Sequence, residues 1–136
     1  MLEYIKNNKN GTIIYKSKTK YEEKTTCLTV IKNLCLEHLF SYEGYKKSVH
    51  IKFNKRNLLP VVLNSELVLM PIKRTKEYDN IWINLKAIKK VISKDKNLII
   101  TFFSNKEIEI NISHSFYLKQ VKLASLIEIE KSKHFH

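Results

Sequence analysis

Residues 97–112 show the clearest alternation of apolar and polar side chains in the sequence. Two runs, NLIITFF and EIEINI, are separated by the three residues SNK. A period of two places alternate side chains on opposite faces of a strand, and the second run has isoleucines on one face and polar residues on the other. Asparagine tolerates the left-handed backbone of a tight turn. The segment therefore predicts an antiparallel hairpin that turns at Asn105.

The periodicity changes after this hairpin. Ser113 or Ser115 is suited to cap a helix, because a serine hydroxyl accepts a hydrogen bond from a free N–H in the first turn. Apolar residues then recur at a spacing near 3.6, which is typical of a helix; they are Tyr117, Val121, Ala124 and Ile127. We predict a C-terminal helix here and expect residues 131–136 to form a loose tail.

The rest of the chain is rich in β-branched residues and short apolar runs, which favours strands. The runs LPVVLN and ELVLMPI are expected to form a hairpin around Asn64 and Ser65. The segment IWINLKAIKKVI at 81–92 is ambiguous, and a short helical turn followed by a strand is expected. Further strands are predicted at 11–15, 25–36 and 48–53.

These elements predict an α+β fold that is mainly antiparallel β, curled into a sandwich or barrel, with one C-terminal helix packed on the sheet. The sequence contains no internal repeat, flexible linker or low-complexity tract. Residues 1–130 are therefore predicted to form a single domain.

The net charge is the strongest compositional indication of function. The 136 residues include 25 Lys and Arg but only 13 Asp and Glu, which gives +12. Such an excess is typical of proteins whose partner is a polyanion, either nucleic acid or an anionic membrane surface. Codon bias toward lysine, asparagine and isoleucine could supply part of the excess, but it explains the shortage of acidic residues less well.

A membrane partner is not expected. No segment combines a cationic face with a long apolar face at helical spacing. The amino terminus lacks the apolar stretch of a signal peptide, and the runs LLPVVL and LIITFF are too short to span a bilayer. We expect a cytoplasmic protein.

Few residues are arranged for catalysis. The histidines do not occur in a metal-binding spacing, and with two glycines the chain lacks a glycine-rich phosphate loop. His50 is a candidate general base of a small nuclease, although a solvated histidine is far commoner. Cys27 and Cys35 match no paired zinc spacing and are expected to be buried and reduced. We predict no enzyme, no cofactor and no metal site.

Basic residues cluster in and after the segment FSYEGYKKSVHIKFNKRN at 40–57. If this segment contains a strand with Phe53 facing inward, Lys46 and Lys52 share the opposite face. An ordinary solvated strand face, with lysines guarding a sheet edge, is the competing interpretation. We predict a cationic strip that contacts phosphate groups. Its candidate residues are Lys46, Lys47, Lys52, Lys55, Arg56, Lys73, Arg74 and Lys76.

Three residues near the start of this segment have structural alternatives. Gly44 is expected to supply a hairpin turn that needs positive φ. Tyr42 and Tyr45 beside it either pack across the hairpin or stack on exposed bases, and packing is the commoner arrangement.

Arginine is nearly absent, because Arg56 and Arg74 are the only two in the sequence. Arginine is the usual bidentate reader of guanine in the major groove. A DNA-binding protein without it relies on phosphate charge, groove width or duplex flexibility, and these favour A/T-rich targets.

Several runs, in a fixed order, resemble the skeleton of the competence transcription factor family, ComK. They are LFSYEGYKKS, LPVVLNSELVLMPI, IWIN, NLIITFFSNKEIEINIS and SFYLKQVKLASL. They are similar to the family's Ser-Tyr-x-Gly-Arg-like turn, Phe-Pro-type strand end, Trp-Ile pair, TFxNG-like hairpin and Ser-Phe helix, and their order and spacing agree over residues 11–127. Lys46 stands where the family usually has arginine, and Asn105-Lys106 replaces Asn-Gly.

The resemblance implies a short or divergent member of the family, because longer members continue past the helix into a tail linked to adaptor-mediated proteolysis and full activation. It implies an activator of DNA-uptake genes that binds A/T-rich promoter boxes, mainly through phosphate and minor-groove contacts. The expected partners are double-stranded A/T-rich DNA, further copies of the chain in a homo-oligomer, and RNA polymerase.

Two alternatives to a competence regulator stay open. The first is an RNA-binding or ribosome-associated module, in which the tyrosines stack on unpaired bases. The second is a small nuclease or toxin built on His50.

Overall fold

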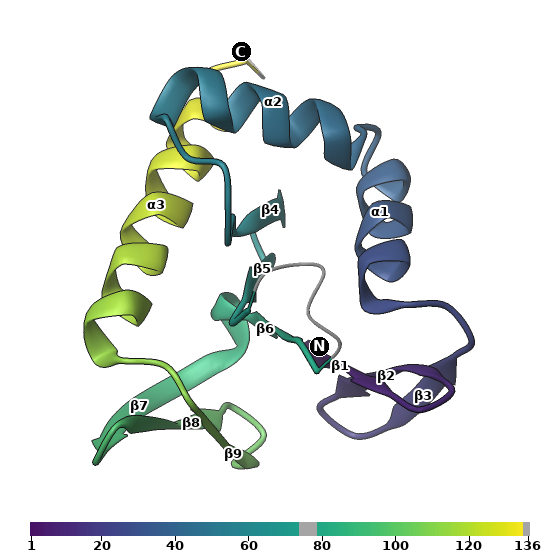
Figure 1. The fold of residues 1–136 in the computed structure, drawn as a ribbon, viewed down its shortest axis with the longest axis vertical. Helices are drawn as coiled ribbons and strands as arrows, with labels where there is room; N and C mark the ends of the chain where they lie inside the picture. Colours follow the sequence, from purple (N-terminus) through teal and green to yellow (C-terminus); the bar gives the residue numbers. More distant parts are fainter. Residues whose placement is uncertain (74–78, 135–136) are drawn as a thin grey trace.

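The computed structural model describes residues 1–73 and 79–134. In this part of the chain, nine strands form two antiparallel sheets, and three α-helices frame them on three sides (Figure 1). The helices are α1 (Cys27–Glu37), α2 (Tyr42–Phe53) and α3 (His114–Ser132). The α+β class, the antiparallel sheets and the C-terminal helix on the sheet are confirmed, and α1 and α2 are additional helices.

The larger sheet has six strands in the order β3-β2-β1-β6-β5-β4. Its strands are β1 (Leu2–Asn8), β2 (Gly11–Lys16), β3 (Lys20–Glu23), β4 (Val61–Asn64), β5 (Leu67–Pro71) and β6 (Ile81–Asn84). The meander β1–β3 is joined by β6 to the hairpin β4–β5, which confirms the hairpin predicted around Asn64 and Ser65. Strand β4 is therefore an edge strand.

The smaller sheet consists of β7 (Ile88–Lys94), β8 (Asn97–Phe102) and β9 (Glu107–Ile110), in that order. Ile100 pairs with Ile108, so the predicted hairpin is confirmed. Asn105 lies in its turn with φ 72°. A short 3-10 turn, Leu85–Ala87, connects β6 to β7, which confirms the helical turn followed by a strand expected within 81–92.

Residues 25–36 were predicted as a strand, and this prediction is wrong because they lie mostly in α1. The Thr26 hydroxyl caps the helix by accepting a hydrogen bond from the Thr29 N–H at 3.2 Å. The buried side chains Cys27, Val30, Ile31 and Cys35 recur at helical spacing. Burial of this face outweighs the modest strand preference of the β-branched residues.

The strand predicted at 48–53 is also wrong, because this segment completes α2. The side chains that α2 buries are Tyr42, Tyr45 and Val49, at a helical spacing of three and four. Ile51, which strand alternation would place on the same face as Val49, is 70% exposed. The alternation over 49–53 is therefore a coincidence of composition and not a strand pattern.

Helix α3 connects two apolar cores. Ala124 and Ile127 pack in the core that α1 and α2 form with the larger sheet, around Trp82. Phe116 and Tyr117 pack against the second core, beneath the smaller sheet. Because the helix runs to Ser132, it extends two residues past the predicted domain boundary at 130. None of the helices in the described residues is both long and apolar enough to cross a lipid bilayer.

Candidate functional site

The structure places five of the eight residues of the predicted strip on α2 or directly after it. The three on the helix are Lys46, Lys47 and Lys52, and the two in the loop that leads to β4 are Lys55 and Arg56. Lys73 follows β5, and Arg74 and Lys76 lie outside the described residues. The strip is thus mainly a feature of one helix and its C-terminal loop.

A helix distributes these lysines differently from a strand. Lys46 and Lys52 are six residues apart, which separates them by about 240° around a helix axis. The expectation that they share one face is therefore wrong. The Lys46 ammonium lies 5.6 Å from the centroid of the Tyr42 ring, close to the buried side. Lys47 is exposed on the outward side, beside exposed Ile51.

Both ends of α2 are capped by their own side chains. The Ser41 hydroxyl accepts a hydrogen bond from the Gly44 N–H at 3.1 Å, and Asn54 takes the left-handed conformation (φ 55°) at the C-terminal end. Glu43 in the first turn pairs with Lys32 of α1 at 3.0 Å, and this hydrogen bond lowers the pKa of its carboxyl. These contacts fix where α2 begins and ends.

Gly44 does not supply the predicted hairpin turn, because it lies in the first turn of α2. A Cβ atom at this position would come within 2.8 Å of the Ser41 hydroxyl oxygen. The glycine therefore leaves room for the capping interaction and is not required for a positive φ.

Tyr42 and Tyr45 belong to the core. Their exposed fractions are 5% and 8%, and burial raises the pKa of both, that of Tyr42 to about 12. The Tyr45 hydroxyl donates to the Pro60 carbonyl at 2.6 Å and accepts from the Val62 N–H at 3.1 Å. Stacking of these rings on unpaired bases, on which the RNA-binding alternative depended, is therefore contradicted.

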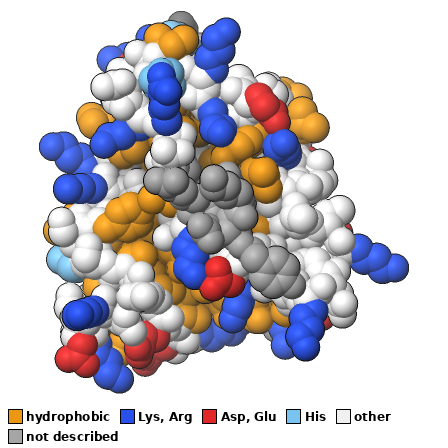
Figure 2. All heavy atoms as spheres, in the orientation of Figure 1, with side chains coloured by type: hydrophobic (Ala, Val, Ile, Leu, Met, Phe, Trp, Pro, Cys, Tyr) orange, Lys and Arg blue, Asp and Glu red, His pale blue; other side chains and the backbone are white. Residues whose placement is uncertain are grey.

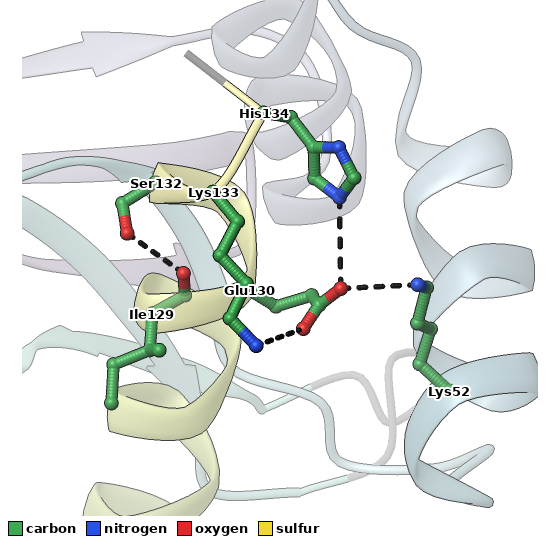
Figure 3. A network of polar contacts seen from close by, with 6 residues as sticks. All are labelled: Lys52, Ile129, Glu130, Ser132, Lys133 and His134. Atoms are coloured by element: carbon green, nitrogen blue, oxygen red, sulfur yellow. Dashed lines mark hydrogen bonds and ion pairs between the residues drawn. The ribbon is translucent and has the colours of Figure 1, made fainter. Parts of the chain in front are cut away.

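Lys52 is held by a carboxylate from α3. Glu130 lies between Lys52, at 3.0 Å, Lys133, at 3.4 Å, and His134, at 3.6 Å (Figure 3). The hydrogen bond from Lys52 is the main reason why the pKa of the Glu130 carboxyl is lowered. Sequence reasoning missed Glu130, which only the packing of α2 beside α3 brings to the strip.

Lys73 lies on a different element but at the same end of the sheet as the loop after α2. Val61 pairs with Leu69, so β4 begins where β5 ends. The Lys73 ammonium contacts Asp79 at 2.6 Å, and this hydrogen bond lowers the pKa of the Asp79 carboxyl. The side-chain amide of Asn80 donates to the Lys73 carbonyl at 2.9 Å and accepts from its N–H at 3.0 Å.

His50 is not arranged as a general base. Its Nε2 atom accepts a hydrogen bond from Arg56 Nε at 3.3 Å. Its Nδ1 atom is buried and has no hydrogen-bond partner among the residues that the structure describes. A general base is usually oriented by a carboxylate or another acceptor at its second nitrogen, so this geometry does not support the nuclease alternative.

Cationic side chains are not confined to α2. Figure 2 shows Lys and Arg over the whole visible face, with a few acidic groups among them. Several lysines are neutralised in pairs, such as Lys94 with Glu109 at 3.8 Å. Within residues 1–73 and 79–134, however, Lys47 and Lys55 form no ion pair. The predicted continuous strip is thus reduced to an α2 cluster, which we define as Lys47, Lys52, Lys55 and Arg56.

Comparison with known families resolves the class of the protein. The model of the ComK family, described as ComK protein, matches residues 1–135. The chain belongs to the ComK family. Nearly the whole chain is covered, so the resemblance carried by the scattered motifs is confirmed. Members of this family are competence transcription factors and not enzymes, and membership indicates a regulator of transcription. No curated protein and no solved structure matches the chain.

Proposed function

We propose that this ComK-family chain is a DNA-binding regulator of DNA-uptake genes that binds A/T-rich promoter boxes. Family membership over residues 1–135 is the observation that carries the proposal. The net charge of +12 supports it, because a large cationic excess is the electrostatic footprint of nucleic-acid binding. Residues 1–130 act as one DNA-binding domain in the cytoplasm, and the active form is a homo-oligomer that works with RNA polymerase.

The α2 cluster is the surface that we assign to phosphate contacts. Lys47 and Lys55 are exposed and carry no carboxylate partner within the described residues, so their charge is available to an incoming phosphate. Lys52 is shared with Glu130, and Lys73 is held by Asp79 in the same way. Exposed ion pairs contribute little to stability, so a phosphate competes readily for such lysines. Lys46 contributes less, because it lies over the Tyr42 ring.

The preference for A/T-rich DNA follows from the shortage of arginine. Arg56 is the only arginine within the described residues, and its Nε atom is engaged by His50. With a single arginine among the described residues, recognition depends more on phosphate charge and on the narrow minor groove and flexible steps of A/T-rich duplexes than on bidentate reading of guanine.

The salt dependence of binding tests this proposal. If about six phosphates are neutralised, the logarithm of the affinity for a labelled A/T-rich duplex falls against the logarithm of salt concentration with a slope near −5. In the double variant Lys47→Ala/Lys55→Ala, the slope becomes shallower by about 2. The matched control is Lys96→Ala, in the β7–β8 turn at the opposite end of the molecule from α2 (Figure 1).

The control variant is expected to bind DNA like the unmodified chain. An unchanged slope in the double variant would remove α2 from the DNA interface, and a flat salt response in the unmodified chain would contradict the function itself. Preference for single-stranded RNA over duplex DNA of the same length would favour an RNA-binding module instead.

A further inference from the structure

A second surface is formed where α2 and α3 lie over the edge strand β4. The groove there has a volume of about 1240 Å³. Its walls are mostly apolar and come from both helices, from β4 and from the turn after α1, and they include Leu39, Phe40, Val49, Phe53, Leu63 and Ile129. Of the described lysines proposed to contact DNA, Lys52 alone lines this groove.

The floor of the groove is not open to a further strand. The outer backbone groups of Val62 in β4, and the Pro60 carbonyl before it, are already occupied, because Tyr45 bridges the Pro60 carbonyl and the Val62 N–H. The Val62 carbonyl accepts a hydrogen bond from Lys131 Nζ at 2.6 Å. A partner in this groove therefore binds through side chains and not by adding a strand to the sheet.

Lys131 places an unbalanced positive charge inside the groove. Its ammonium lies 4.1 Å from the centroid of the Phe40 ring and 5.7 Å from that of Tyr45, and burial lowers its pKa. Among the described residues it contacts no carboxylate. The acidic groups at the rim do not balance it, since Glu128 pairs with Lys86 at 3.0 Å and Glu130 with Lys52.

Leu39 lines the mouth of the groove but is hardly buried by the folded chain. Its side chain is 94% exposed, and its backbone takes the left-handed conformation (φ 68°) in the turn that ends α1. Glycine is the usual residue at such a position, because a Cβ atom makes this conformation unfavourable. Ile129, 55% exposed, extends the apolar surface on the side of α3. Large apolar residues that are both exposed and grouped indicate a protein-binding surface.

We propose that this groove binds an amphipathic helix of a partner protein, whose apolar side chains pack between α2 and α3 against Leu39 and Ile129. A carboxylate on that helix pairs with the Lys131 ammonium. A helix is the form of peptide that presents an apolar stripe while satisfying its own backbone, which a groove with an occupied strand edge requires. The proposal goes beyond DNA binding and uses different residues.

A selection with a defined peptide library tests the proposal. The library displays helical peptides of about 16 residues with leucine fixed at i, i+3, i+4 and i+7 and the remaining positions randomised. Peptides are selected from it for binding to the full chain. Enriched peptides are expected to carry aspartate or glutamate beside the leucine stripe. Absence of enrichment, or enrichment without an acidic position, overturns the proposal.

Variants of the chain then show where the peptide binds. The most enriched peptide is labelled with a fluorophore, and its affinity for each variant is measured by fluorescence anisotropy. Leu39→Gly is expected to weaken binding about tenfold, because it removes a buried leucine contact, while its melting temperature stays unchanged or rises. Lys131→Met is expected to weaken binding of the acidic peptide about tenfold and to leave its glutamine analogue unaffected. Lys96→Ala is the control with no expected effect.

Three results would overturn the assignment. Equal binding by Leu39→Gly excludes the mouth of the groove, and equal loss of both peptides in Lys131→Met excludes the charge pair. Dimers in sedimentation that Leu39→Gly dissociates would show that a second copy of the chain occupies the groove. DNA binding by Leu39→Gly is expected to be unchanged, so failure of this proposal is distinct from failure of DNA binding.

Discussion

Helices α2 and α3 meet at the Lys52–Glu130 ion pair (Figure 3). Both bury apolar side chains, but α3 also turns polar side chains inward and leaves more large apolar residues exposed. Helix α2 buries aromatic and apolar side chains and exposes charged ones such as Lys47. Helix α3 buries Gln120 and half-buries Lys131. It leaves three large apolar residues exposed, and they are Leu118, Leu126 and Ile129.

This difference follows from what each helix covers. Helix α2 packs rings against the core, where the Tyr45 hydroxyl contacts backbone groups. Helix α3 lies against a segment of irregular backbone and edge strand, whose carbonyls need donors: Gln120 supplies one to Leu58 and Lys131 supplies one to Val62. Helix α3 thus combines a partly polar inward face with exposed apolar residues. The outward face of α2 therefore suits a polyanion, and the groove beside α3 suits a protein.

The largest expected effect concerns the contact of α2 with β4. Tyr45→Phe leaves the Pro60 carbonyl and the Val62 N–H without their partner, and each buried unsatisfied group costs about 1–3 kcal/mol. We expect the free energy of unfolding in urea to fall by about 2–4 kcal/mol.

The matched control for this change is Tyr42→Phe on the same helix. The Tyr42 hydroxyl forms no hydrogen bond within the described residues, so we expect a change of less than about 1 kcal/mol. Equal losses in the two variants would mean that the rings, and not the Tyr45 hydroxyl, anchor α2.

The corresponding contact of α3 is somewhat weaker. Gln120 Nε2 donates to the Leu58 carbonyl at 2.6 Å, and Leu58 itself has φ 56°. Gln120→Ala is expected to lower the free energy of unfolding by about 1–3 kcal/mol, because the buried carbonyl loses its donor. Lys122→Ala on the exposed face is expected to change it by about 0.5 kcal/mol or less. A similar small value for Gln120→Ala would show that water replaces the amide.

The contrast between the helices also explains what the sequence could predict. The hairpin at 97–112 and α3 were recognisable because local pattern and tertiary environment agree: Ile100 and Ile108 pair, and Ser113 caps the helix that follows. In α1, the residues Thr29, Val30 and Ile31 favour strand, and burial on one face, together with the Thr26 cap, selects the helix.

The helical pattern of α2 was present but was read with the wrong period. Ser41 precedes Tyr42, Tyr45 and Val49 at helical spacing, which is a capping residue followed by an apolar stripe. The ion pairs could not be predicted, because Glu130 and Lys52 are brought together only by tertiary packing.

The two buried cysteines of α1 are expected to make the free energy of unfolding moderately dependent on pH in the alkaline range. Burial raises the pKa of the Cys27 and Cys35 thiols to about 11 from an ordinary value of 9.0. Between these values the unfolded chain has lost protons that the folded chain retains, so stability falls as pH rises. Each thiol contributes at most about 1.4 kcal/mol per pH unit in that window.

The variant Cys35→Ala tests this contribution by urea denaturation at a series of alkaline pH values. Its stability is expected to fall less steeply above pH 9 than that of the unmodified chain, because one of the two raised thiols is gone. Identical slopes would mean that other groups, such as the buried tyrosines, dominate alkaline unfolding.

The smallest expected effect is a change in DNA affinity when the ion pair between α2 and α3 is removed. Glu130→Gln removes the carboxylate that holds Lys52, so Lys52 becomes free to bind phosphate. Affinity for an A/T-rich duplex is expected to rise about two- to fivefold, with a salt slope steeper by about 1, as one more released counterion requires.

Glu109→Gln, which frees Lys94 on the smaller sheet, is the matched control because it changes net charge equally. An equal gain in both variants would mean that only total charge matters, and α2 would then have no special place in DNA binding. A gain confined to Glu130→Gln would instead show that the cations held by Glu130, which are Lys52 of α2 and Lys133 just after α3, lie at the DNA interface.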